Sequence, residues 1–334
     1  MNRDQRITAF HNLGTFLDTL PSPQFQSLAD LARQHNPWFT EQSIQMSVRG
    51  IRKFLYRETL EAWLSPYPLP PAERTIGVVM AGNVPMVGFH DLLSVLIAGH
   101  NILIKESAKD SVLMHFITDA LMTIEPQFRQ AIRFADRLKN FDGIIATGSD
   151  NASRYFEYYF SRHPHIIRKN RTSVAILDGQ ESTDELMLLG EDIFSYFGLG
   201  CRNVSKLFLP EGYSPEKLFS GWEAFKEIIH HHKFHNNYDY QKSLLLINQK
   251  HFLDNGFLLL EENDKLVSPI AVVYYGFYKD PASLTNQLAE IRDKTQCVVG
   301  TDNGAAVPFG QAQYPAVTDY ADDVDTLRFL TTLN

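Results

Sequence analysis

The chain has 334 residues, enough for about two domains of average length, and its 44% hydrophobic and 21% charged content argues against a disordered or fibrous protein. Acidic residues outnumber basic ones by 39 to 31, and the net charge of -8 argues against nucleic acid or an anionic membrane surface as a partner. Two cysteines and an N-terminus without an apolar leader favour a cytoplasmic protein with no membrane span.

The first half of the chain passes from helices to alternating strands and helices. Apolar residues recur at helical spacing from about residue 5 to residue 60, and a Pro-rich linker follows over residues 65–71. Short β-branched runs then predict strands, which lie at 75–81, 101–105, 131–135, 143–146 and 173–177. The segments between them predict helices at 87–98, 111–124 and 152–162. This alternation predicts a doubly wound parallel sheet, which binds ligands at its carboxyl edge.

The second half predicts another α/β domain. Helices are expected at 184–197, 215–231 and 284–293, and strands at 204–209, 243–247, 257–260, 271–277 and 297–300. We therefore divide the chain into a helical N-terminal segment with its linker (1–72), a nucleotide-binding domain (73–178), a catalytic domain (179–310) and a C-terminal tail (311–334). The tail could supply an edge strand through which a homo-oligomer forms.

Cys201 is the first candidate for chemistry. It follows two closely spaced glycines, Gly198 and Gly200, at a predicted helix-to-strand junction, where the backbone can approach a ligand. Arg202 beside it would favour the thiolate, which is the nucleophilic form of cysteine. The alternative is a buried cysteine that acts as a small hydrophobic residue, and this alternative suits Cys297 better than Cys201.

Three further candidates follow predicted strands of the first sheet. Asn83 comes after the strand at 75–81, Lys105 ends the next one, and Thr147-Gly148-Ser149 joins a strand to a helix. An amide can donate a hydrogen bond to an oxyanion, an ammonium group beside a hydroxyl can hold a ribose or a phosphate, and a glycine turn admits a flat ring. Each also has an ordinary interpretation, since Ser149 could cap a helix and Lys105 could be a solvated strand end.

A histidine cluster and an aromatic run each suggest a function that we do not expect this protein to have. The histidines at 230, 231, 232 and 235 point in different directions on a helix, and no carboxylate or cysteine completes a tetrahedral set, so we expect no metal. The aromatic run of residues 155–160 is expected to pack as part of a helix rather than to stack nucleic acid bases.

Taken together, these segments resemble the aldehyde dehydrogenase superfamily, and most of all the LuxC-type (long-chain) acyl-CoA reductases. The likeness extends over about residues 70–330 and is carried by Gly82-Asn83-Val84-Pro85, residues 96–105, the cysteine loop at 197–204, Ser268-Pro269-Ile270, and the tail from Phe309-Gly310-Gln311 to residue 327. The resemblance implies an aldehyde-dehydrogenase-like α/β fold, NADP(H) or alternatively NAD(H) as cofactor, and CoA as substrate and leaving group, with no metal.

The resemblance also implies a role for each candidate residue. Cys201 would be the nucleophile and Asn83 an oxyanion donor. Lys105 and Ser107 would contact the adenosine ribose, and Thr147-Gly148-Ser149 would form the turn on the nicotinamide side. The glutamate that holds the nicotinamide ribose has two candidates, Glu261 and Glu262.

One departure from the superfamily bears on the reaction. Hydrolytic aldehyde dehydrogenases carry a glutamate that activates water, and Arg168 stands at that position here. The segment 168–171 could instead contact a nucleotide phosphate or form a solvated turn. The expected reaction is NAD(P)H-dependent reduction of a long-chain fatty acyl-CoA to an aldehyde through a thioacyl-cysteine. A CoA-independent aldehyde dehydrogenase and a non-catalytic binding subunit of the same fold remain alternatives.

Overall fold

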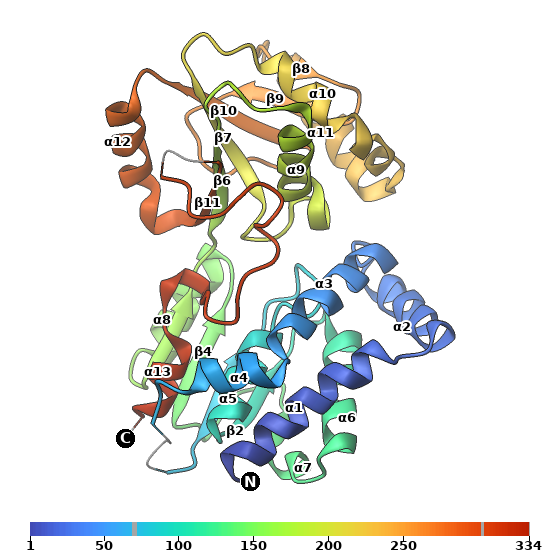
Figure 1. Ribbon diagram of the computed structural model, residues 1–334, viewed down its shortest axis with the longest axis vertical. Coiled ribbons are helices and arrows are strands. Elements are labelled where there is room, and N and C mark those ends of the chain that lie inside the picture. Colours follow the sequence, from blue (N-terminus) through green and yellow to red (C-terminus); the bar gives the residue numbers. More distant parts are fainter. Residues whose placement is uncertain (69–71, 302–303, 334) are drawn as a thin grey trace. The chain divides into compact units, whose positions relative to one another are not determined.

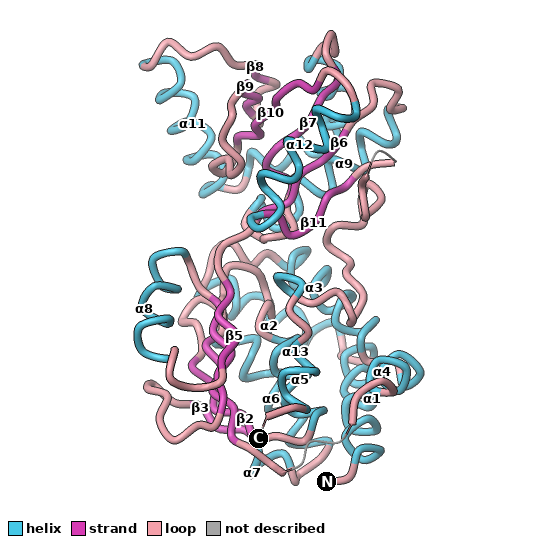
Figure 2. The backbone as a smooth tube through the Cα atoms, turned by 90° about the vertical axis from the view of Figure 1, so that its left-hand side faces the viewer, coloured by secondary structure: helices cyan, strands magenta, loops and turns pink. Residues whose placement is uncertain are grey.

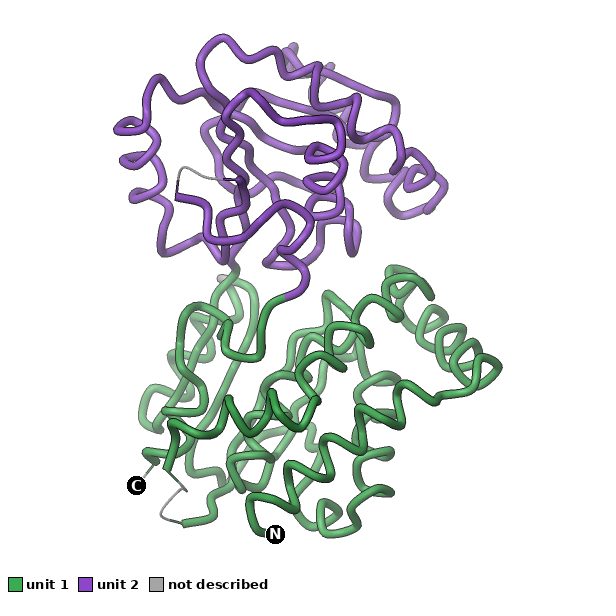
Figure 3. Tube along the Cα trace, in the orientation of Figure 1, with its two compact units in different colours: residues 1–170, 315–334 green, residues 171–314 purple. Residues whose placement is uncertain are grey.

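A computed structural model describes residues 1–68, 72–301 and 304–333 of the chain. The chain forms two compact units (Figure 3), the first comprising residues 1–170 and 315–334 and the second residues 171–314. Each unit contains one mainly parallel sheet with helices packed on it, which confirms the predicted α/β class. Residues 69–71 of the predicted linker lie outside the described part of the chain.

The sheet of the first unit has five parallel strands in the order β3-β2-β1-β4-β5. The strands are β1 (Thr75–Val79), β2 (Asn101–Lys105), β3 (Ile132–Phe134), β4 (Gly143–Thr147) and β5 (His165–Arg168). The strand order changes direction at β1, because β1 pairs with β2 on one side and with β4 on the other. In doubly wound sheets, ligands bind at the carboxyl ends of the strands where the order reverses.

Helices cover both faces of this sheet. They are α1 (Arg3–Asp18), α2 (Ser22–His35), α3 (Glu41–Phe54), α4 (Arg57–Leu64), α5 (Phe89–Ala98), α6 (Ser111–Ile124), α7 (Phe128–Ala131), α8 (Asp150–Phe160), the 3-10 turn η5 (Ala321–Asp323) and α13 (Thr326–Thr331). Right-handed crossovers place α5 and α6 on one face and α8 on the other, as Figure 2 shows.

The N-terminal helices belong to the core of the first unit. Asn2 and Gln5 form a capping box that starts α1. The buried Ile7, Phe10 and Leu13 then recur at the spacing of one helix face, and this face packs on α5 and α6. The helical preface predicted from the sequence is therefore an integral layer over the sheet (Figure 1).

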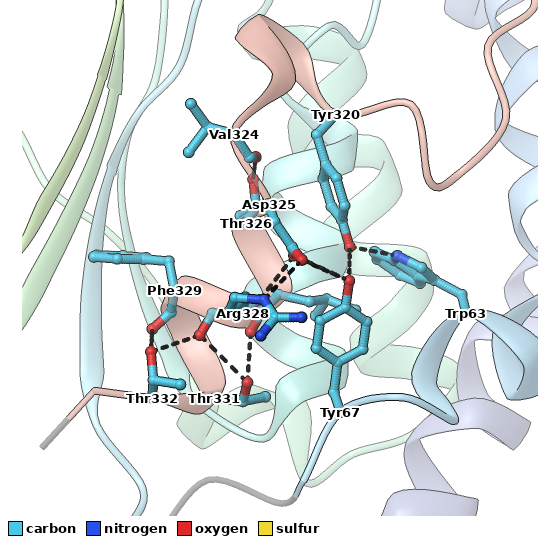
Figure 4. A network of polar contacts seen from close by, with 11 residues as sticks. Trp63, Tyr67, Tyr320, Val324, Asp325, Thr326, Arg328, Phe329, Thr331 and Thr332 are labelled. Carbon is cyan, nitrogen blue, oxygen red and sulfur yellow. Dashed lines mark hydrogen bonds and ion pairs between the residues drawn. The ribbon is translucent and has the colours of Figure 1, made fainter.

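The C-terminal tail is fastened to the same unit by a polar network (Figure 4). The indole N–H of Trp63 donates to the Tyr320 hydroxyl at 2.7 Å, and the Tyr67 hydroxyl donates to the Asp325 carboxylate at 2.9 Å. Asp325 also accepts from the backbone N–H of Arg328 and so caps α13. We expected a strand here, but the described residues 311–333 contain the helix α13 and no strand, so that expectation is wrong.

The second unit contains a six-stranded sheet in the order β11-β6-β7-β10-β9-β8, in which β8 alone is antiparallel to its neighbour. Its strands are β6 (Thr172–Ile176), β7 (Val204–Pro210), β8 (Leu253–Asp254), β9 (Leu259–Glu262), β10 (Val272–Tyr278) and β11 (Thr295–Val299). We expected the segment 173–177 among the strands of the first sheet. It pairs instead with β7 and β11 of the second.

The helices of the second unit lie on both faces of its sheet. They are α9 (Thr183–Phe194), α10 (Phe219–Trp222), α11 (His232–Ile247) and α12 (Pro281–Ile291), with 3-10 turns η1 (Ser195–Gly198), η2 (Pro215–Leu218), η3 (Glu223–His230) and η4 (Arg292–Lys294). Adjacent residues of β7 serve different faces: Leu207 packs in the core with α9, whereas Phe208 packs with Leu284 of α12.

One predicted element has the wrong type. Residues 243–247 were expected as a strand, but they are the last turns of α11. This helix starts at a cap, since His231 accepts a hydrogen bond from the N–H of Phe234. Its buried residues Phe234, Tyr238 and Leu245 lie on one helix face, whereas Leu246 and Ile247 are exposed. A short apolar run is compatible with either a strand or a helix. Here the N-terminal cap and the helical spacing of the buried residues favour the helix.

Candidate active site

Three of the predicted site segments lie at one edge of the first sheet. Val79, the last residue of β1, pairs with Lys105 of β2 on one side and with Ala146 of β4 on the other. Asn83 follows β1, and Thr147 follows Ala146, so the candidates from the three strands surround the position where the strand order reverses. The sheet brings these residues together at the edge where doubly wound sheets bind ligands.

Asn83 lies half-buried on the turn that connects β1 to α5. The turn is held from the helical layer, because the Ser47 hydroxyl of α3 donates to the carbonyl oxygen of Pro85 at 2.7 Å. Met86 has a φ of 56°, in the left-handed region that residues other than glycine rarely adopt. The turn therefore has a fixed shape, and its amide side chain has the chemistry of an oxyanion donor.

Lys105 and Ser107 offer hydrogen-bonding groups that suit a ribose. Within residues 1–68, 72–301 and 304–333, Lys105 forms no ion pair, and its side chain is partly exposed. The Ser107 hydroxyl accepts from the backbone N–H of Lys109 at 3.3 Å, which leaves its own proton to donate. Gly82 packs closely on this serine, because a Cβ at Gly82 would lie 2.4 Å from the Ser107 oxygen.

The turn from Thr147 to Ser149 begins the helix on the opposite face of the sheet. The Ser149 hydroxyl accepts from the backbone N–H of Ala152, so this serine is the N-cap of α8, which was one of its two interpretations. A Cβ at Gly148 would lie 2.7 Å from the Phe156 ring and 2.9 Å from Ala152. The glycine thus permits close packing of the turn on α8. The positive end of the helix dipole also favours an anionic group nearby.

These groups together fit a nicotinamide nucleotide. An ammonium, a free hydroxyl proton and the start of a helix lie at the same sheet edge, and they match the hydroxyls and phosphates of such a ligand. All of these donors belong to the first unit.

Cys201 lies in the second unit on an exposed loop between η1 and β7. The alternative of a buried, purely hydrophobic cysteine is therefore wrong for this residue. Three consecutive residues before it are left-handed, with φ values of 51° at Tyr196, 59° at Phe197 and 77° at Gly198. Residues other than glycine in this region cost about 1–3 kcal/mol each, and such strain is concentrated at functional sites.

Asn203 holds this strained loop in place. Its side-chain NH₂ group donates to the carbonyl oxygens of Asp192, Ile193 and Ser195, which are left without partners at the end of α9. Its side-chain oxygen accepts from the N–H of Gly200 at 2.8 Å. A single buried amide thus ties the residue before Cys201 to the end of a helix. Asn203 was not among the residues predicted from the sequence, although an asparagine directly before the apolar strand β7 was a possible signal.

The side chain of Asp192, in the last turn of α9, extends this hydrogen-bond network. Its buried carboxylate accepts from the backbone N–H groups of Gly310 and Ala312, at 2.7 and 2.9 Å. Burial raises the pKa of Asp192 to about 7, and these two hydrogen bonds oppose the rise. Arg202 donates to the carbonyl oxygen of Ala312 at 3.4 Å. The segment with Phe309-Gly310-Gln311 is therefore fixed beside the Cys201 loop.

Cys297 also lies near this loop, on β11. Its sulfur is 3.0 Å from the hydroxyl oxygen of Ser173, and the same hydroxyl lies 3.1 Å from the carbonyl oxygen of Cys201. Ser173 is fully buried, and the backbone N–H of Cys297 donates to its oxygen. Cys297 is thus only partly buried and contacts both the apolar core and a hydroxyl, so the expected fully buried hydrophobic cysteine is correct only in part.

Arg168 has a structural role that the sequence analysis missed. It ends β5 and is buried, and its guanidinium donates to both carboxylate oxygens of Asp91 on α5, each at 2.7 Å. It also donates to the Thr326 hydroxyl at the start of α13. Of the two roles considered for the segment 168–171, neither holds for the buried Arg168, whereas Lys169 and Asn170 are exposed, as a solvated turn requires. Its neighbour Lys169 is exposed and pairs with Glu157.

The two glutamate candidates differ in their surroundings. Glu261 is buried and accepts from the side chain of Asn263 at 3.0 Å, whereas Glu262 is exposed. Both line an open cavity of about 380 Å³ in the second unit together with Lys250, His251, Asn263 and Asp264. Either carboxylate could accept from a ribose hydroxyl, and the choice between them stays a prediction.

The histidine cluster and the aromatic run at residues 155–160 were the two other clusters considered from the sequence. Among the described residues, no group of three or more His, Cys, Asp and Glu side chains has the arrangement of a metal site. In the aromatic run, Phe156 and Phe160 stack on each other, but Tyr155, Tyr158 and Tyr159 are 66–80% exposed. Our expectation that the whole run packs is therefore wrong for the tyrosines.

No helix in the described part is both long and apolar enough to span a membrane.

Comparison with known proteins gives a family and a fold. A family model described as acyl-CoA reductase (LuxC) matches residues 49–215 of the chain. No curated protein matches the chain. Among solved structures, aldehyde dehydrogenase 21 from Physcomitrella patens, in complex with the reaction product succinate, is 11% identical with a TM-score of 0.67, covering 99% of this chain and 84% of its own.

Two bacterial structures are similar to the chain as well. The NAD+ complex of an aldehyde dehydrogenase from Bacillus cereus is 12% identical with a TM-score of 0.63, covering 90% of this chain and 72% of its own. The NADP complex of glyceraldehyde-3-phosphate dehydrogenase from Bacillus halodurans is 13% identical with a TM-score of 0.61, covering 90% and 74%. At such low identity the likeness shows the fold, which is that of aldehyde dehydrogenases.

Proposed function

Because the chain belongs to the acyl-CoA reductase (LuxC) family, we propose that it reduces a long-chain fatty acyl-CoA to the aldehyde, with NADPH, or alternatively NADH, as the reductant. The observation that carries the proposal is the Cys201 loop. Its cysteine is exposed, three left-handed residues precede it, two of them not glycine, and the buried amide of Asn203 ties the loop to the end of α9. A loop held in this way presents its sulfur in one place, as a nucleophile requires.

Cys201 would take the acyl group from CoA in the first half of the reaction. Its thiolate sulfur bonds to the thioester carbonyl carbon, and the carbonyl oxygen becomes an oxyanion. We assign the role of oxyanion donor to the backbone N–H of Cys201 and, from the resemblance to aldehyde dehydrogenases, to the side-chain N–H of Asn83. The carbon–sulfur bond to CoA then breaks, CoA leaves as a thiolate that takes a proton from solvent, and the acyl group remains on Cys201 as a thioester.

The second half of the reaction regenerates the cysteine. When bound, the nicotinamide nucleotide supplies a hydride. Lys105 and Ser107 would hold its adenosine ribose, and the Thr147-Gly148-Ser149 turn would lie on its nicotinamide side. The thioester carbon receives the hydride, the carbon–sulfur bond to Cys201 breaks, and the aldehyde leaves with the thiolate restored. In total, acyl-CoA, NADPH and one proton give aldehyde, CoA and NADP+.

The surroundings of Arg168 support reduction over hydrolysis. This residue stands where hydrolytic relatives carry a water-activating glutamate, and it is buried in an ion pair with Asp91. A guanidinium group has N–H donors and no acceptor, so it cannot remove a proton from water. The thioacyl group on Cys201 would therefore persist until it is reduced or returned to CoA.

An absorbance assay of NADPH separates this proposal from its two alternatives. The wild-type chain and Cys201→Ser are each given NADPH with a long-chain acyl-CoA, and separately NADP+ with a free long-chain aldehyde in the absence of CoA. We expect NADPH consumption that needs both acyl-CoA and Cys201. Oxidation of the aldehyde without CoA would identify a CoA-independent dehydrogenase, and no turnover in either arm would indicate a non-catalytic subunit; each result would overturn the proposal.

A further inference from the structure

Asp110 directs its carboxyl group to an unusual partner. It occupies the N-cap position of α6, where aspartate commonly accepts a hydrogen bond from its own helix, yet it makes no such bond. One carboxyl oxygen accepts instead from the backbone N–H of Met86 at 2.7 Å. The other oxygen, Oδ1, is buried without a hydrogen-bond partner among the described residues. The Asp110 side chain thus does not cap α6, and its carboxyl binds the turn that carries Asn83.

The environment of Asp110 favours the uncharged form of this carboxyl. The residue is 3% exposed, and burial raises its pKa to about 8, against the opposing effect of the Met86 hydrogen bond. Glu106 of the same loop raises the pKa further, and Glu106 itself pairs with His115 of α6 at 3.1 Å. Lys109 is exposed beside it, and the turn at residues 82–88 contains no titratable side chain.

The contacts of Asp110 join two of the candidate site segments. Met86, whose N–H it accepts, is the left-handed residue of the turn, three positions after Asn83. At the start of the same turn, a Cβ on Gly82 would lie 2.4 Å from the Ser107 oxygen and 3.2 Å from the Asp110 Cβ. The turn with Asn83 and the loop with Lys105 and Ser107 are thus packed together through Asp110.

We propose that Asp110 is a positioning residue that sets the place of Asn83 relative to Lys105 and Ser107. The inference rests on the proposed function, because it assigns Asn83 to the oxyanion and Lys105 to the nucleotide. Ionisation would leave a buried charge with one unsatisfied oxygen, and the turn would have to open to hydrate it. The positioning is therefore lost as the pH rises through about 8, the pKa of Asp110.

Two substitutions test this role. Asp110→Asn keeps the shape and an oxygen acceptor for Met86 but cannot ionise, whereas Asp110→Ala removes the acceptor. Asp119→Asn, on the exposed face of α6, is the matched control. Turnover and the KM for NADPH are measured for the four proteins from about pH 6 to about pH 9.5, a range that includes the alkaline limb.

We expect the wild type and Asp119→Asn to lose activity as the pH rises through about 8 and Asp110→Asn to keep it. Asp110→Ala should lose about 100-fold in kcat/KM at pH 7, since a small displacement of a reacting group costs this much. An unchanged alkaline loss in Asp110→Asn, or wild-type kinetics in Asp110→Ala, would overturn the inference.

Thermal unfolding separates this inference from the proposed function. The folded-state pKa of Asp110 exceeds its unfolded value of 3.8, so the wild type should lose stability relative to Asp110→Asn as the pH rises from about 4 through about 8. If no protein reduces acyl-CoA, the proposed function fails, while unfolding and NADPH titration still decide the role of Asp110. A flat stability difference across this range would contradict the buried, neutral carboxyl.

Discussion

The side-chain oxygen of Asn203 accepts a hydrogen bond from the backbone N–H of Gly200, at 2.8 Å, across the turn that contains Cys201. The NH₂ group of the same side chain donates to three carbonyl oxygens at the end of α9. These bonds act beside the ring contacts of Phe197 with His231 and Phe234, next to the left-handed Tyr196 and Phe197. The amide of Asn203 is therefore one of the groups that fix the position of the sulfur.

Asn203→Asp should make Cys201 less reactive. The carboxylate has nearly the shape of the amide but repels the three carbonyl oxygens, and each lost hydrogen bond costs about 1 kcal/mol. We expect the rate of alkylation of Cys201 by iodoacetamide, followed by mass spectrometry of the peptide, to fall about 10-fold as the loop relaxes. Asn237→Asp removes one similar bond in α11 and should leave the rate unchanged. Equal rates in both variants would exclude a positioning role for Asn203.

Asn83→Ala should slow turnover and spare nucleotide binding. An oxyanion donor contributes about 100- to 1,000-fold to kcat, and this residue is not among the proposed nucleotide contacts. The measurements are kcat with acyl-CoA and the Kd for NADPH from fluorescence. Asn101→Ala, at the amino end of β2, is the control at the opposite edge of the same sheet. If Asn83→Ala retained most of its kcat, the oxyanion assignment would be wrong.

Arg168→Met should destabilise the first unit strongly. Removal of one partner from a buried ion pair leaves Asp91 charged and unpaired, which costs about 3–5 kcal/mol. The double variant Asp91→Leu/Arg168→Met removes both charges, and we expect it to recover most of this loss in urea unfolding. Lys169→Met breaks the neighbouring exposed pair with Glu157 and should change stability by less than about 1 kcal/mol. Additive losses in the double variant would show that the two residues do not act as a pair.

His100 should make the docking of the C-terminal tail sensitive to acid. It is buried, its Nδ1 accepts from the N–H of Arg74, and its Nε2 donates to the carbonyl oxygen of Leu330, so the ring is neutral. Burial lowers the pKa of His100 below its ordinary 6.5. The stability it contributes is therefore present above about pH 6.5 and lost as the pH falls toward the lower folded-state pKa. The difference in unfolding free energy between wild type and His100→Asn should shrink in acid, and a constant difference would contradict a neutral ring.

Features of the fold that depend on a local sequence pattern could be predicted from the sequence. The strands at 75–79, 101–105 and 143–147 are buried β-branched runs, and their polar endings placed Asn83, Lys105 and Thr147 at one edge because parallel strands share an edge. The partners of buried polar groups could not be found in this way. Arg168 pairs with a residue 77 positions earlier, and no local pattern connects the two. The role of Asn203 likewise depends on carbonyl oxygens that only the end of α9 leaves free.

The wrong predictions for residues 243–247 and 173–177 have physical reasons of the same kind. Residues 243–247 are an apolar run of a length that suits either a strand or a buried helix, and the cap at His231 decides in favour of the helix. The segment 173–177 has the composition of a parallel strand, and composition does not say which of two sheets it joins.

The central claim is that Cys201 carries the acyl group, and intact-mass spectrometry after a single turnover tests it most directly. The chain is mixed with a long-chain acyl-CoA in the absence of reductant. One portion is digested and its peptides are mapped, and NADPH is added to a second, intact portion before the same measurement. We predict an acyl mass increase on the peptide that contains Cys201, none on the peptide with Cys297, and loss of the adduct with release of aldehyde once NADPH is present. An unmodified Cys201, or an adduct found on Cys297 alone, would contradict the account.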